Sequence, residues 1–364
     1  MSDLQPLPRR AYRLLSDGQF HSGTRLAADC RVSRNAIWKA IAALRSLGVT
    51  VHAVPNRGYR LPAATALLER ERIVKLLPRA VASRLRTGQC VWRTGSTNTD
   101  LLQRDAPPAG HFDFLTAEYQ TAGRGRRARS WFAPPGGAIC LSISWCFASL
   151  PRDISALSLA IGVCALRGMA QIGVTGAALK WPNDLVVGSA KLGGILIELR
   201  AEAGGPAYVV VGLGLNVALG AEVLRQVQAS GTQAADLIGL GAKRPDRNRL
   251  AAALIASAVA GLEQFERDGF AAASPAMRAA SIAAGHCACR RARDCSDLSP
   301  ARCRREPPRE AAAAGCRQFA AQMGGAAPTL SASSGFRGTG SHESRGAARF
   351  GCRLVTPFKN GRNA

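Results

Sequence analysis

Seven short apolar runs between residues 89 and 213 constrain the fold more than any other feature of the sequence. Each has the length and the β-branched or aromatic content of a strand. They cover residues 89–94, 114–119, 138–147, 177–180, 185–188, 191–199 and 207–213. Two longer segments, Ser155 to Ile172 and Arg247 to Arg267, are predicted helices. Residues 89–270 are therefore predicted to form an α/β domain with a sheet at its core.

The connection between the second and third of these runs is strongly basic. Residues 123–129, the arginine loop, contain four arginines and two glycines, and Trp131 follows. A charged loop between two buried strands cannot itself be core. Glycine lets backbone N–H groups approach a ligand closely, and guanidinium groups match phosphate and carboxylate geometry. We therefore expect this loop to close over an anion, although a solvated basic turn has the same composition.

Four further motifs accompany the predicted strands. They are Gly95-Ser96-Thr97-Asn98, Lys180-Trp181-Pro182-Asn183-Asp184, Lys191-Leu192-Gly193-Gly194-Ile195-Leu196 and Gly212-Leu213-Gly214-Leu215-Asn216. The last motif lacks the third glycine and the following helix of a dinucleotide fingerprint, which excludes a Rossmann site. None of the motifs contains a histidine, which argues against a Ser-His-Asp hydrolase.

In this order, and with the arginine loop, the motifs resemble the biotin–protein ligase family. With the N-terminal segment, the chain is similar to its bifunctional bacterial type, which is both ligase and biotin-operon repressor. The resemblance covers residues 8–270 and implies a multidomain α/β (α+β) protein. The catalytic domain, residues 89–270, would be related to class II synthetases and lipoate ligases. It would have a mixed sheet with helices on one face.

The resemblance also implies a reaction in two steps. The biotin carboxylate attacks the α-phosphate of ATP, which gives biotinyl-5′-adenylate and pyrophosphate. A lysine of a biotin carboxyl carrier domain then displaces AMP. Neither step needs an enzyme nucleophile, but both need negative charge to be neutralised. ATP, biotin and Mg²⁺ are the expected ligands.

Residue roles follow from the matched motifs. The biotin-binding set is Ser96, Thr97, Asn98, Gln120, Arg124, Gly125, Arg126 and Lys191. The ATP-binding set is Arg126, Arg129, Trp131, Asn183 and Asn216. The catalytic set is Lys191 for phosphate neutralisation, Arg126 for retention of the adenylate, and Asp184 for the acceptor lysine or Mg²⁺. Simpler structural roles stay open: Ser96 or Thr97 as a helix cap, Trp131 as core, and Lys191 as a solvated strand-end side chain.

Residues 1–62 are predicted to be a winged helix-turn-helix that binds DNA. Ser22 and Ser33 can cap two short helices within residues 23–42, and a hairpin wing follows. This segment has ten Lys/Arg against three Asp/Glu. The predicted DNA-binding set is Ser33, Arg34, Asn35, Trp38, Lys39 and Arg57. A small protein-interaction module is the alternative.

The remaining segments are a linker and a tail. Residues 63–88 are predicted to be a helical linker. From about Ala271 the strand pattern stops, and residues 285–364 hold fourteen Lys/Arg, five Asp/Glu and six cysteines. The spacing of these cysteines matches no common zinc site. We expect residues 271–364 to be disordered in place of the family's SH3-like barrel. The abrupt change suggests a shifted reading frame, which would impair activity.

Partners and location complete the expectations. No apolar run is expected to reach membrane-spanning length and the N-terminus lacks a signal peptide's apolar stretch, so a cytoplasmic protein is predicted. The expected partners are operator DNA, a biotin carboxyl carrier domain and a second copy in a ligand-dependent homodimer. Two other functions stay open. One is a non-enzymatic repressor that senses biotin or its adenylate, and the other is a lipoate- or octanoate-type acyl transferase on the same core.

Overall fold

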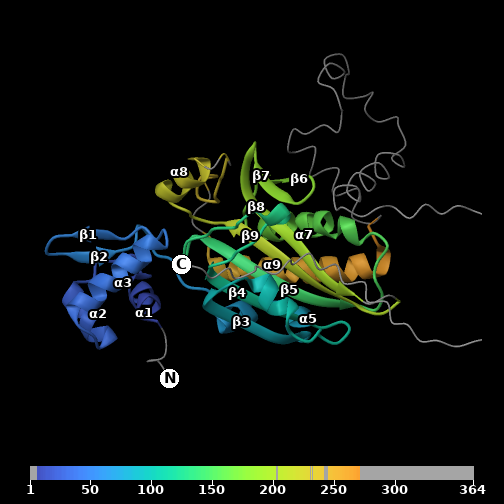
Figure 1. Cartoon of the computed structure of the whole chain (residues 1–364), viewed down its shortest axis with the longest axis horizontal. Coiled ribbons are helices and arrows are strands. Elements are labelled where there is room, and N and C mark those ends of the chain that lie inside the picture. Colours follow the sequence, from blue (N-terminus) through green and yellow to red (C-terminus); the bar gives the residue numbers. More distant parts are fainter. Residues whose placement is uncertain (1–5, 202–203, 230, 232, 242–244, 271–364) are drawn as a thin grey trace, which may run out of the picture.

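A computed structural model describes residues 6–201, 204–229, 231, 233–241 and 245–270. Figure 1 shows a small, mostly helical unit, drawn in blue, beside a larger unit built on a sheet. The predictions for residues 271–364, including the disordered tail, lie outside the described residues.

The small unit has the predicted winged-helix arrangement. Three helices precede a β-hairpin: α1 (Leu7–Leu15), α2 (Gly23–Cys30), α3 (Arg34–Ser46), β1 (His52–Val54) and β2 (Gly58–Arg60). Both predicted caps are confirmed. The Ser22 hydroxyl accepts the Arg25 N–H at 3.1 Å, and the Ser33 hydroxyl accepts the Ala36 N–H at 3.2 Å. These bonds fix the starts of the two helices that form the helix-turn-helix.

The connecting segment is partly helical, with α4 (Arg70–Leu76) and α5 (Arg79–Ala82). It is tied to the larger unit, because Leu68, Ile73 and Leu77 are buried in the core of that unit. The Asn248 side chain makes two hydrogen bonds to the backbone of this segment. Its Oδ1 accepts the Glu69 N–H at 2.8 Å and its Nδ2 donates to the Leu67 carbonyl at 3.0 Å.

A mixed sheet organises the larger unit, as predicted. The strands are β3 (Leu85–Thr94), β4 (Phe112–Gln120), β5 (Ala138–Phe147), β6 (Ala178–Lys180), β7 (Asp184–Val187), β8 (Ala190–Ala201) and β9 (Ala207–Asn216). Their order is β3-β4-β5-β9-β8-β7-β6. β3 and β4 are parallel, and the other neighbouring pairs are antiparallel. Each of the seven predicted strand runs overlaps one of these strands.

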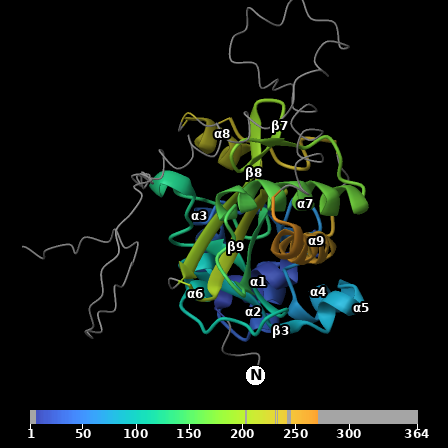
Figure 2. The same ribbon diagram turned by 90° about the vertical axis from the view of Figure 1, so that its right-hand side faces the viewer.

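The two faces of the sheet differ. The helices α7 (Leu157–Gln171), entered through the 3-10 turn η2 (Ile154–Ala156), and α9 (Arg247–Asp268) lie together over one face (Figure 2). Ile139 and Leu141 of β5 point into that core. The short helix α6 (Thr97–Leu102) packs on the opposite face, where Leu101 meets Leu115 of β4. The prediction of helices on one face is correct for α7 and α9, but α6 is an exception because Leu101 is buried on the other side.

One helix was not predicted, and one predicted helix is more apolar than expected. α8 (Ala221–Ala229) follows β9 in a segment without a clear helical pattern. The segment Ile154–Gln171 is long and apolar enough to cross a membrane, by length and composition only, and 67% of it is buried inside the fold. The prediction that no apolar run reaches this length is therefore wrong by this criterion, because Arg167 is the one charged residue of the segment. The burial is that of a core helix, packed on the sheet beside α9.

Candidate active site

One cavity of about 610 Å³ gathers the residues that the sequence singled out. Every member of the predicted biotin- and ATP-binding sets lines it, and so does Asp184. The cations of its wall outnumber the carboxylates. Its lining includes Arg124, Arg126, Arg127, Arg129 and Lys191, and among the described residues Asp184 is the one Asp or Glu that lines it. A cavity with this balance favours an anionic ligand.

The polar end of the cavity is built at the start of α6. Ser96, Thr97 and Asn98 are each at most 5% exposed. The Ser96 hydroxyl faces the Thr99 N–H at 3.5 Å, a long N-cap contact, so Ser96 is a weak cap as well as a wall residue. The Gln120 Oε1 accepts the Thr97 N–H at 2.8 Å and lies 3.1 Å from the Thr97 hydroxyl. These bonds join the end of β4 to the helix start.

The glycine motif of β9 makes room for site side chains. A Cβ atom on Gly212 would overlap the Asn98 amide, and one on Gly214 would lie 2.7 Å from the Trp131 ring. Gly212, Gly214 and Asn216 are spaced by two, so they share one face of the strand. The motif therefore lets a side chain and an indole ring lie directly against the sheet.

The arginine loop is folded over the same cavity. It forms a bridge between Arg124 and Ser130 and contains the 3-10 turn η1 (Arg126–Ala128). Arg127 and Ala128 have positive φ angles of 55° and 57°, a region that side chains other than glycine adopt at a cost. Burial and the neighbouring Arg127 charge both lower the pKa of Arg126, and the Asp184 carboxylate opposes them. An anion beside Arg126 would relieve that repulsion.

The opposite wall carries a lysine in an ion pair. The Lys191 Nζ lies 2.7 Å from the Asp184 Oδ1, so both side chains are held in the cavity. Asn183 is bonded to β8, because its Nδ2 donates to the Ile195 carbonyl at 2.8 Å. The Asn216 Nδ2 donates to the Ala235 carbonyl at 3.0 Å. A lysine that is solvated at a strand end would lack the Asp184 partner.

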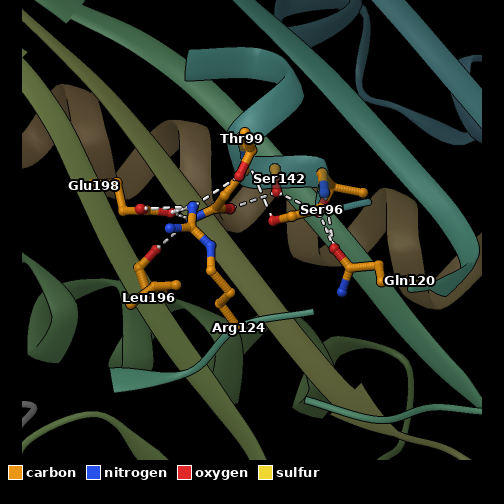
Figure 3. A network of polar contacts seen from close by, with 9 residues as sticks. Ser96, Thr99, Gln120, Arg124, Ser142, Leu196 and Glu198 are labelled. Carbon is orange, nitrogen blue, oxygen red and sulfur yellow. Dashed lines mark hydrogen bonds and ion pairs between the residues drawn. The ribbon is translucent and has the colours of Figure 1, made fainter. Parts of the chain in front are cut away.

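Several site residues were not predicted. Glu198 of β8 pairs with Arg124, and Ser142 of β5 contacts Thr97 and Asn98 (Figure 3). Cys140 also lines the cavity, and burial raises the pKa of its thiol to about 11. Single polar residues in alternating strands resemble ordinary surface positions, so no sequence pattern singles out Glu198 or Ser142.

The predicted DNA-binding residues lie on α3, at its start and at the tip of the wing. Arg34, Asn35, Trp38 and Lys39 are exposed on α3, and 60% of Trp38 is accessible. Ser33 caps α3, which places it at the helix start. At the wing, the Arg57 guanidinium lies 4.2 Å from the centre of the Phe20 ring. The arrangement presents an apolar indole and several cations on one helix.

The fold and this cavity define a helix-turn-helix unit joined to a ligase domain of the biotin/lipoate class. The model of the biotin/lipoate A/B protein ligase family matches residues 92–216, and an HTH domain model matches residues 9–60. The bifunctional ligase/repressor BirA of Escherichia coli K12 is 38% identical over 265 residues, which are 73% of this chain and 79% of that protein. The chain belongs to the family of bifunctional biotin–protein ligase/repressors.

The chain is also similar to two further proteins over part of their length. The biotin–[acetyl-CoA-carboxylase] ligase of Mycobacterium tuberculosis is 41% identical over 170 residues, 45% of this chain and 60% of that protein. A solved biotin protein ligase from Aquifex aeolicus, in complex with biotin and ATP, is 24% identical. It covers 51% of this chain and 74% of its own, with a TM-score of 0.42.

Proposed function

We propose that the chain activates biotin with ATP and transfers it to a lysine of a biotin carboxyl carrier domain. The observation that carries this proposal is a cavity in which five cationic side chains meet a polar end with the buried residues Ser96, Thr97 and Asn98. A neutral heterocycle with N–H and C=O groups suits the polar end. A carboxylate and phosphates suit the cations.

The polar end is proposed to bind the ureido ring of biotin. A buried hydroxyl or amide that is left without its partner is costly, so such a site discriminates well against ligands that lack matching groups. Gln120 uses its Oε1 for Thr97, and its Nε2 also contacts the Cys140 thiol, so one N–H of Nε2 is proposed to meet a ring carbonyl. Ser96, Thr97 and one Oδ1 lone pair of Asn98 are the proposed remaining contacts. Arg124 and the Gly125 backbone would meet the ligand nearer its carboxylate.

The cationic end is proposed to bind the reacting phosphate. Lys191 and Arg126 would neutralise charge as the biotin carboxylate attacks the α-phosphate. Arg126 would then hold the adenylate until the acceptor lysine arrives. Arg129, Trp131, Asn183 and Asn216 are the proposed contacts to the rest of the nucleotide. Bound Mg²⁺ would add charge neutralisation, and Asp184 is the carboxylate of this wall that could hold it together with phosphate oxygens.

The test is pyrophosphate release by the full chain in the presence of biotin and ATP, followed by transfer to a purified carrier domain. Lys191→Gln should abolish most of the release. Lys75→Gln, which removes an exposed lysine of α4, should leave it unchanged. Biotin binding without pyrophosphate release would instead support the non-enzymatic sensor, and a preference for lipoate would support the acyl transferase.

We propose further that the winged helix represses transcription by binding an operator with two half-sites. One such domain contacts few bases, and most of its affinity comes from phosphates, so a biotin-dependent homodimer would be required. Fluorescence anisotropy with a duplex that carries two half-sites should show tighter binding when biotin and ATP are present. Lys39→Gln should weaken this binding and reduce its dependence on salt, while Lys75→Gln should not. Monomeric sedimentation in saturating biotin and ATP would refute the dimer.

A further inference from the structure

We propose that Glu198 is a positioning residue for the biotin end of the cavity. Its carboxylate fixes the orientation of the Asn98 amide and ties Arg124 of the arginine loop to β8. The inference rests on the proposed function and adds a residue that belongs to neither predicted ligand-binding set.

The first observation is the set of hydrogen bonds that the Asn98 side chain makes. Its Nδ2 donates to the Glu198 Oε2 at 2.9 Å and to the Leu196 carbonyl at 3.2 Å. Its Oδ1 accepts the Ser142 hydroxyl at 2.6 Å (Figure 3). The carboxylate and the carbonyl can only accept, so the amide nitrogen must face β8 and the amide oxygen must face β5. Asn98 therefore retains one lone pair for a ligand and no donor.

The orientation of Asn98 carries through to the neighbouring wall residue. The Ser142 hydroxyl hydrogen is committed to Asn98, and the Ser142 Oγ lies 2.7 Å from the Thr97 Oγ1. The Thr97 hydroxyl can then donate to Ser142 or to the Gln120 Oε1, which lies 3.1 Å away. If the Asn98 amide turned over, an N–H would face the Ser142 hydroxyl and this arrangement would change. Glu198 therefore influences the Thr97 hydroxyl indirectly, through Asn98 and Ser142.

The second observation is the contact between Glu198 and the arginine loop. The Arg124 Nη2 lies 2.8 and 3.1 Å from the two Glu198 carboxylate oxygens and 2.8 Å from the Thr99 Oγ1. Within the described part of the chain, the Nε and Nη1 of Arg124 have no hydrogen-bond acceptor. Arg124 can therefore receive a ligand carboxylate on its free nitrogens while one nitrogen stays attached to β8.

The charges show why the two residues must work as a pair. A carboxylate this close to the site would repel anionic biotin unless Arg124 compensated it. The Arg124 side chain is 45% exposed and that of Glu198 is 21% exposed, so water screens the pair and its contribution to overall stability is small. Its effect should therefore appear in ligand binding rather than in folding.

The experiment measures biotin affinity by calorimetry and the kinetics of pyrophosphate release on the full chain. Glu198→Gln keeps an acceptor for Asn98 but removes the charge that holds Arg124. We expect biotin Kd and the KM for biotin to rise about tenfold, which is the loss of one partly screened charge-assisted hydrogen bond. The KM for ATP should stay within about twofold, because the phosphate end is untouched. Glu198→Ala should raise the biotin Kd further. The control Glu71→Gln, which removes an exposed carboxylate that pairs with Arg70, should bind biotin as tightly as the parent chain.

A second comparison tests the pairing directly. Arg124→Gln leaves the Glu198 charge uncompensated, so it should weaken biotin binding more than the double variant Arg124→Gln/Glu198→Gln does. Thermal unfolding of each variant shows whether it is folded, and Glu198→Gln carries the test if Glu198→Ala does not fold.

Two results would overturn the inference while leaving the proposed function in place. One is parental biotin affinity in Glu198→Gln, and the other is an equal rise of the KM values for biotin and ATP, which would indicate a general structural role. If the parent chain itself neither binds biotin nor releases pyrophosphate, the proposed function fails and the inference falls with it.

Discussion

Removing one partner of the buried ion pair between Glu118 and Arg247 should strongly destabilise the ligase domain. The two side chains are 4% and 3% exposed, and the Arg247 Nη2 lies 2.8 Å from the Glu118 Oε2. Burial disfavours the Arg247 charge, but the Glu118 carboxylate, together with Tyr12 and Cys140, outweighs burial, so the pKa of Arg247 is raised. The carboxylate also accepts two backbone N–H groups, from Leu68 at 2.7 Å and Gly136 at 3.0 Å. Both carboxylate oxygens of Glu118 therefore already accept hydrogen bonds.

Glu118→Gln keeps the shape of the side chain but leaves Arg247 as a buried charge without a counter-ion. One amide nitrogen would also face an N–H donor. Removing one partner of a buried pair costs about 3–5 kcal/mol, and the Ala138 and Ala66 carbonyls that also accept from Arg247 do not replace the charge. For a domain of this size that cost corresponds to a fall in Tm of about 6–20 °C.

Urea unfolding followed by circular dichroism would measure this loss. Glu71→Gln is the matched control, because it removes an exposed carboxylate that pairs with Arg70, and it should change stability by less than about 0.5 kcal/mol. A second readout is proteolysis of residues 62–70, which should accelerate because the Leu68 N–H loses its anchor. A free energy of unfolding within about 1 kcal/mol of the parent would refute the reasoning, since the buried charge would then be tolerated without its partner.

Three further predictions concern backbone strain and thiol burial. Ala128→Gly should stabilise the folded arginine loop by about 1 kcal/mol and slow its cleavage by trypsin, because glycine tolerates the positive φ of 57°, while the control Ala122→Gly should not. Gly136→Ala should destabilise the chain by about 2 kcal/mol or more in urea unfolding, because the φ of Gly136 is 75° and a Cβ atom would overlap the Tyr12 hydroxyl. Adding Tyr12→Phe should restore part of that loss, because it removes the hydroxyl. The pKa of the Cys140 thiol is raised to about 11, so above its usual pKa of 9.0 the thiol ionises in the unfolded state but stays protonated in the folded state. The free energy of unfolding should therefore be unaffected below pH 9 and should fall by about 2–3 kcal/mol between pH 9 and 11. Cys140→Ala should show a correspondingly smaller fall in urea unfolding at these pH values.

Local features were predictable because local chemistry decides them. Ser22 and Ser33 cap helices through their own hydroxyls, and neither bond requires knowledge of the rest of the chain. The strand runs are apolar enough to be found one at a time. β5 was predicted at the bounds that it has, Ala138–Phe147, because both of its faces are buried and the run is continuous.

Pairing between distant segments was not predictable from patterns. β5 pairs with β9 from Ala138↔Asn216 to Phe147↔Ala207, and no local signal selects that partner. The same applies to Glu118, which looks like an ordinary charged residue near the end of a strand. Its partner is 129 positions away at the start of α9, and only the fold brings them together. Contacts of this kind carry much of the site geometry, which is why Glu198 also escaped notice.

The winged helix meets the ligase domain beside the site, a placement that the motifs do not encode. Tyr12 of α1 packs against Trp92 of β3 with ring centres 5.9 Å apart, and Trp92 packs edge-on against Tyr119 of β4 at 5.8 Å. Trp92 and Tyr119 lie close in the sequence to the start of α6 and to Gln120, so these strands carry both the interdomain contact and the polar end of the cavity. A helix of the DNA-binding unit and the proposed biotin contacts therefore share the same two strand ends. We therefore expect a ligand that shifts those ends to displace α1 as well, because closely packed aromatic side chains leave little free space between them.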